Sequence, residues 1–280
     1  MSFDIAFAPG VRALAIATDA HLKKSLHVSG ARIAATIDAG VSWSPSFVYK
    51  DAEGFIVGIE VSEVIYPFSL RIAYAELINC SFPLRAIVVC PEEVFLAQPN
   101  QDDAEKLKAH GFGLWTVDKS GVVRERYRAI LLSQVVTETD FAAVTDHFKR
   151  KSRERLRMAY EKYSQDPLSG LRDVTEGAEA LANGILASAL KSGLQLSKEQ
   201  RRHGIAKKLD YILEQNVLGR GYAEIAGLRR YITKYRNQGH HAPKTEKDAT
   251  KRIKTVRQAF LEGAAVVGDV QAAFPNARWS

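Results

Sequence analysis

The sequence predicts two domains of different class, a mixed α/β domain over residues 1–138 and an all-α domain over residues 139–280. In the first half, short β-branched or aromatic runs alternate with helical segments, whereas apolar residues recur at three- and four-residue steps through most of the second half. Charge divides the chain in the same way. Residues 1–140 carry 13 Lys and Arg against 17 Asp and Glu, and residues 141–280 carry 26 against 15. A basic half favours polyanionic partners, because binding phosphates releases condensed counterions.

The first half is expected to form a central sheet flanked by helices. The apolar spacing predicts a helix over residues 11–38, or two helices interrupted at Gly30. A hairpin follows, in which strands at 46–50 and 55–61 flank the polar turn Asp51–Gly54. The remaining predicted elements are helices at 66–79 and 101–110 and strands at 84–90, 112–117 and 122–127.

Composition places further limits on the chain. No segment approaches the roughly 18 apolar residues that a membrane span needs, and the N-terminus lacks a basic region followed by an apolar core. Cys80 and Cys90 do not form a metal-type pair. A phosphate-binding Gly-rich loop and a His-Glu-x-x-His zinc motif are also absent from the sequence. These observations predict a cytoplasmic protein with no membrane partner and no cofactor.

The order of elements over about residues 11–130 resembles the PD-(D/E)xK restriction-endonuclease-like fold. That resemblance implies a divalent metal held by an acid on one hairpin strand and an acid-x-Lys on the next. The matching positions are Pro45-Ser46 and Glu60-Val61-Ser62, so serines replace the Asp and the Lys. Because Mg²⁺ binds through carboxylates in near-octahedral geometry, Glu60 alone is an incomplete metal site. The simpler interpretation is a partly buried acid paired on the sheet, with Asp51 and Glu53 as solvated turn residues and Glu63 as another nearby acid.

A strongly basic segment opens the second half, with six Lys or Arg in residues 148–157. Such a run is either a solvated helix face or an electrostatic groove for a nucleic-acid backbone. The candidate nucleic-acid-binding residues are Lys149, Arg150, Lys151, Arg153 and, further along the chain, Lys234.

Four main helices with one apolar stripe each predict a bundle after residue 170. Ser197 and Gln200 are spaced as a capping box at the start of the second helix. The third helix is predicted over residues 222–238, ended by Gly239 and Pro243. Thr245 with Asp248 is expected to cap the fourth.

The end of the third helix carries an arginine, an amide and two histidines within six residues: Arg236, Asn237, His240 and His241. The planar guanidinium of Arg is positively charged and can donate two hydrogen bonds to one phosphate, and His gains or loses a proton near neutral pH. These residue types suit phosphodiester chemistry without a metal.

A bundle with Arg236, Asn237 and His241 in this position resembles the HEPN (higher eukaryote and prokaryote nucleotide-binding) domains, over about residues 150–275. The resemblance implies a metal-independent endoribonuclease in which the RNA 2′-hydroxyl attacks the adjacent phosphate. His241 would act as general base or acid, Arg236 would hold the phosphate and Asn237 would fix its geometry, with His240 as a substitute for His241.

The same resemblance implies a homodimer through the C-terminal bundle and a role as a toxin or phage-defence effector, with an antitoxin or defence-system partner. RNA is the expected substrate, and DNA is the alternative ligand. Two other hypotheses remain open: a non-catalytic nucleic-acid-binding or regulatory protein, and a metal-dependent DNase that uses Glu60.

Overall fold

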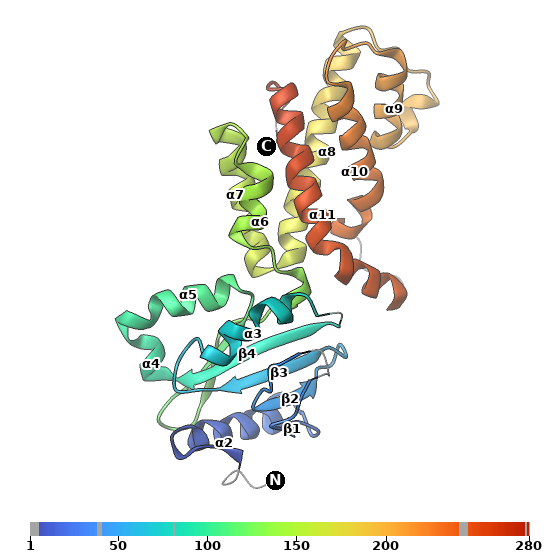
Figure 1. The fold of residues 1–280 in the computed structure, drawn as a ribbon. Coiled ribbons are helices and arrows are strands. Elements are labelled where there is room, and N and C mark those ends of the chain that lie inside the picture. Colours follow the sequence, from blue (N-terminus) through green and yellow to red (C-terminus); the bar gives the residue numbers. More distant parts are fainter. Residues whose placement is uncertain (1–5, 38–40, 81, 241–245, 278, 280) are drawn as a thin grey trace. The chain divides into compact units, whose positions relative to one another are not determined.

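The computed structural model describes residues 6–37, 41–80, 82–240, 246–277 and 279, and for residues 99, 237–240, 246–252 and 254 it describes the backbone alone. The chain divides into two compact units, Met1–Val135 and Val136–Ser280 (Figure 1). The described residues form a mixed α/β structure, with helices in both units and one sheet in the first. No helix among the described residues is long and apolar enough to cross a membrane.

The sheet of the first unit has six described strands in sequence order. Its strands are β1 (Arg32–Ile33), β2 (Phe47–Lys50), β3 (Ile56–Val61), β4 (Leu84–Pro91), β5 (Gly113–Val117) and β6 (Val123–Tyr127). β3, β4 and β5 are parallel neighbours, and the other pairs are antiparallel. The central strand β4 is a nearly continuous apolar run because both of its faces are covered.

Helices cover both faces of this sheet (Figure 1). The helices of the unit are α2 (Pro9–Lys24), α3 (Phe68–Ile78), α4 (Glu92–Leu96) and α5 (Gln101–Ala109). Leu14 and Leu22 of α2 pack with Ile59 on one face. On the other face, Leu70 of α3 packs with Val88.

The predicted helix over residues 11–38 is wrong in its second part. α2 ends at Lys24, where the amide groups of Ser25 and Leu26 donate to the carbonyl oxygen of His21. His27 then adopts a left-handed backbone with φ 54°, which reverses the chain and allows β1 to pair with β2. The other predicted elements of this half occur within two residues of their expected bounds.

The second unit is helical in its described part. Its helices are α6 (Glu138–Thr145), α7 (Arg150–Gln165), α8 (Pro167–Lys191), α9 (Ile205–Gln215), α10 (Tyr222–His240) and α11 (Glu246–Ala273). α8 packs against α7, α9, α10 and α11, and its buried stripe includes Val174, Ala178, Leu181 and Ile185. The basic segment is therefore part of a separate helix, α7, added to the four predicted ones.

The predicted capping box forms, but it does not open the helix. The Ser197 amide donates to the Gln200 side chain at 2.9 Å, and the Gln200 amide donates to the Ser197 hydroxyl at 3.2 Å. A single 3-10 turn, Gln200–Arg202, follows. The extended backbone of His203 ends this turn, so α9 begins only at Ile205. Thr245, expected to cap the last helix, lies outside the described residues.

Candidate phosphate-binding site on the helical unit

Arg236 lies near the C-terminal end of α10, with its side chain on the surface. Four residues of this helix, Ile225, Leu228, Ile232 and Tyr235, are buried at helical spacing and fix its inward face. Arg236 comes next to this stripe and is 51% exposed. Its Nε atom lies 2.6 Å from Oε1 of Glu179 on α8. The guanidinium is thus anchored on one side and open to solvent on the other.

Glu179 reaches Arg236 because it borders the buried stripe of α8. Ala178 and Leu181 face the core, while the side chain of Glu179 is 23% exposed at the edge of that stripe. Two other acids of this helix have different surroundings. Asp173 instead lies 3.1 Å from Lys162, and Glu176 is exposed. No local feature of the sequence distinguishes Glu179 from other acids beside an apolar stripe.

Asn237 and His240 of the predicted motif follow Arg236 along the same helix. α10 continues through Gly239, which was expected to end it, and stops at His240. The backbone of Asn237 and His240 is therefore helical, while His241 lies outside the described residues. The C-terminal end of a helix carries a partial negative charge, which favours a protonated imidazole nearby.

Lys234 faces a different neighbour. Residues i and i+2 of an α-helix are separated by about 200° around its axis. The side chains of Lys234 and Arg236 therefore leave α10 in nearly opposite directions. Lys234 Nζ lies 3.3 Å from Oε2 of Glu262 on α11, and Gln258 donates to the other oxygen of that carboxylate at 2.6 Å. The structure therefore does not bring Lys234 together with Arg236.

Glu60, the acid at the nuclease-like position, has both of its oxygens hydrogen-bonded. Its two oxygens accept from the Trp43 indole at 3.0 Å and from the Ser69 hydroxyl at 3.2 Å. Burial raises its pKa above the ordinary value. Ser46, in the place of the missing Asp, accepts from the amide of Val61 at 3.0 Å. Within the described ranges, no group of three or more His, Cys, Asp or Glu side chains is placed to hold a metal ion.

Of the two turn acids expected to be solvated, Glu53 is 59% exposed and Asp51 only 17%, and both pair with one arginine. Arg85 of β4 contacts Asp51 at 2.5 Å and Glu53 at 2.9 Å. Asp51 also accepts from the amides of Glu53 and Phe55, both at 2.9 Å. These carboxylates therefore close the hairpin and do not complete a site with Glu60.

No protein-family model, curated protein or solved structure matches this chain. Its function is therefore to be inferred from its own side chains.

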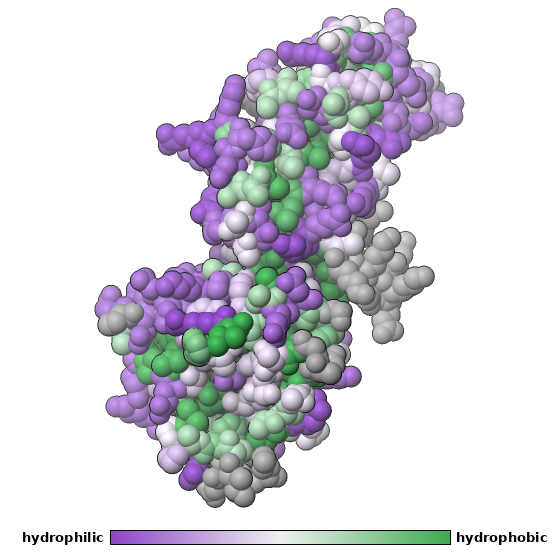
Figure 2. Space-filling model, in the orientation of Figure 1, coloured by the Kyte–Doolittle hydropathy of each residue, from purple (hydrophilic) through white to green (hydrophobic). Residues whose placement is uncertain are grey.

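The basic residues at the start of α7 form a second, more exposed set. Arg150 pairs with Glu154 at 2.7 Å, and Arg153 approaches Asp146 at 3.9 Å. Lys149 and Lys151 are exposed and have no ion pair with any residue in the described part of the chain. Figure 2 shows a largely hydrophilic surface over α7. This end of α7 can contribute free positive charge to a polyanion.

Proposed function

We propose that this chain is a metal-independent endoribonuclease of HEPN type, with Arg236, Asn237 and His241 as its catalytic residues. The observation that carries the proposal is the open guanidinium of Arg236 at the end of α10, held by Glu179 at 2.6 Å. An ion pair with this much exposure is worth about 0–1 kcal/mol. A phosphate group that binds the guanidinium in a bidentate manner can displace such a partner.

The proposed reaction needs only proton transfer and charge stabilisation. The 2′-hydroxyl oxygen attacks the adjacent phosphorus and loses its proton to a base. The bond to the 5′ oxygen breaks, and that oxygen takes up a proton, which leaves a 2′,3′-cyclic phosphate and a 5′-hydroxyl. His241, or His240 in its place, moves the proton. Arg236 stabilises the charge that develops on the phosphate oxygens, and the Asn237 amide orients the group.

The proposal extends to assembly and setting. It includes a homodimer through the C-terminal bundle, in which the Arg–His sets of two copies enclose one phosphate. A ribonuclease that acts in the cytoplasm as a toxin or phage-defence effector would damage its own cell if it were always active. An antitoxin or defence-system partner would restrain it.

The identity of the histidine can be tested through the cleavage products. Purified protein is incubated with RNA in EDTA, and the new ends are analysed for a 2′,3′-cyclic phosphate. We expect cleavage by the wild type and its loss in His241→Ala, with activity kept in His240→Ala. The reverse pattern would assign the role to His240. Retained cleavage when both histidines are replaced would refute a histidine mechanism.

A second candidate function, nucleic-acid binding without cleavage, is favoured by Lys149 and Lys151, which are exposed and form no ion pair with the residues that the structure describes. A protein that neutralises phosphates binds more weakly as salt rises. Binding of RNA or DNA that falls with salt, depends on these lysines and produces no cut in any buffer would favour this function over the ribonuclease.

A further inference from the structure

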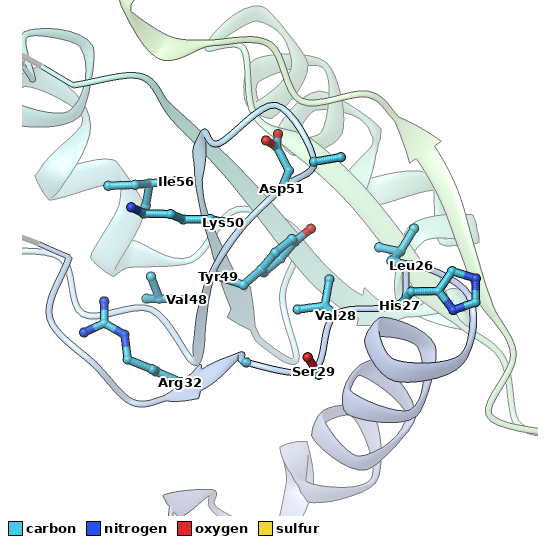
Figure 3. Close-up of a pocket in the computed structure, with 12 residues that line it drawn as sticks. Leu26, His27, Val28, Ser29, Arg32, Val48, Tyr49, Lys50, Asp51 and Ile56 are labelled. Carbon is cyan, nitrogen blue, oxygen red and sulfur yellow. The ribbon is translucent and has the colours of Figure 1, made fainter.

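The first unit contains a cavity of about 930 Å³ at the β1–β2 edge of its sheet. It is lined by the segment from Leu26 to Gly30 and by residues 48–52, which are the end of β2 and the two residues after it. Arg32 and Ile56 complete the lining (Figure 3). A cavity of this size lies within the range of small-molecule sites.

The main chain of β2 is uncovered inside this cavity. The Ala34 amide donates to the Ser46 carbonyl at 3.0 Å, so Ser46 turns its main-chain groups toward β1. Along an antiparallel strand the N–H and C=O groups of successive residues point to alternate sides, so those of Val48 and Lys50 also point toward the β1 side. The pairing with β1 reaches only Val48, opposite Arg32. The N–H and C=O groups of Lys50 therefore face the cavity as one donor and one acceptor.

Two cations lie beside this open edge. Arg32 lies opposite Val48, and Lys50 is the next residue of β2 on the same face of the sheet. Both side chains are exposed, and neither forms an ion pair with another described residue. Figure 3 shows them extending on the same side of the strand. Side chains at such diagonal positions are close enough to share one anion.

The acid in the cavity wall does not cancel this charge. The Asp51 carboxylate accepts two backbone amide bonds, each 2.9 Å long, and contacts Arg85 at 2.5 Å. Arg85 also contacts Glu53 at 2.9 Å, so Asp51, Glu53 and Arg85 together carry one negative charge. Arg32 and Lys50 outweigh that one negative charge, so these five side chains together keep one net positive charge.

The opposite side of the edge is apolar and aromatic. The Tyr49 ring lies there with Leu26 and Val28 (Figure 3). Burial, with smaller contributions from Asp51 and Glu125, raises the pKa of Tyr49 to about 12. The phenol therefore stays protonated at neutral pH and remains a neutral donor.

We propose that this cavity binds a nucleoside phosphate, either as a free nucleotide or as the 5′-terminal nucleotide of a strand. Arg32 and Lys50 hold the phosphate, the base packs against Tyr49, Leu26 and Val28, and its polar edge pairs with the main chain of Lys50. This site belongs to the first unit and does not depend on the proposed ribonuclease activity.

Calorimetric titration of the full chain with adenosine 5′-monophosphate, adenosine and inorganic phosphate tests the site. The nucleotide should bind at least about tenfold more tightly than either fragment, because adenosine lacks the charge-assisted hydrogen bonds of the phosphate and inorganic phosphate lacks the contacts of the base. Arg32→Gln and Lys50→Gln should each weaken it about tenfold. Lys119→Gln and Arg128→Gln are matched charge controls in the β5–β6 turn and just after β6, and should change binding less than about twofold.

A 5′-phosphorylated deoxytetranucleotide and its 5′-hydroxyl form distinguish the two sources of the ligand. They lack the 2′-hydroxyl, so the proposed ribonuclease cannot cut them. Tighter binding of the phosphorylated form than of the mononucleotide identifies a strand end, and the opposite order identifies a free nucleotide. Equal affinity for adenosine and its monophosphate, no binding of the monophosphate, or equal effects of the cavity and control variants would overturn the proposal.

Discussion

Replacing Glu179 by Gln is the most informative single change near the proposed catalytic site. The substitution keeps the size of the side chain and removes the charge that holds Arg236 at 2.6 Å. If Arg236 is a phosphate ligand, Glu179 competes with the substrate for it. The variant should therefore bind RNA more tightly than the wild type.

The size of this effect follows from the exposure of the pair. Arg236 is 51% and Glu179 23% exposed, which limits the ion pair to about 1 kcal/mol. Since 1.4 kcal/mol corresponds to a tenfold change in affinity, the gain should not exceed about fivefold. One additional available cation should also steepen the salt dependence of single-strand binding by about 0.7 in logarithmic slope.

The assay is fluorescence anisotropy with a 2′-O-methyl RNA, which has no attacking hydroxyl and stays intact. Glu176→Gln is the matched control, because it makes the same charge change one turn earlier on α8 at an exposed residue. It should leave the salt slope unchanged. Weaker binding by Glu179→Gln, or a salt slope equal to that of the control, would refute competition for Arg236.

Two further predictions concern stability and are measured by urea unfolding. Gly263→Ala should destabilise the helical unit by about 1–3 kcal/mol, because the new Cβ would lie 2.4 Å from the Tyr231 hydroxyl. Gly227→Ala places its Cβ in open space on α10 and should stabilise the unit by up to about 1 kcal/mol. Equal effects of the two substitutions would contradict this packing. Burial raises the pKa of Glu60, so its contribution is fully present below the unfolded value and is lost as pH rises through the folded one. Glu60→Gln should therefore be more stable relative to the wild type at pH 7 than at pH 4, and a pH-independent difference would contradict the raised pKa.

Strands β2 to β6 of the first unit could be predicted because their residues carry a local signal. Short β-branched runs such as β4 end at Gly, Pro or polar turns, and neither feature depends on distant contacts. The helix predicted over residues 11–38 failed for the converse reason. Apolar spacing continues past Lys24, but the left-handed backbone at His27 and the pairing of Arg32 with β2 depend on tertiary structure.

The partners of charged residues could not be read from the sequence. Glu179 looks like any acid beside an apolar stripe until α10 brings Arg236 against it. Asp51 and Glu53 have the composition of a solvated turn, and only the parallel pairing of β3 with β4 brings Arg85 to them. Local patterns thus predicted the elements, while the pairing of charges required the fold.

The central proposal is that Arg236 stabilises the cleavage of RNA without a metal, and the rate of that cleavage in EDTA tests it most directly. Arg236→Ala should lower the rate by about 10²–10³-fold, as expected when one group that stabilises a transition-state charge is removed. Arg230→Ala, an exposed arginine of the same helix, should cut at the wild-type rate. Cleavage that persists in Arg236→Ala, or that appears only when Mg²⁺ is added, would contradict the proposal.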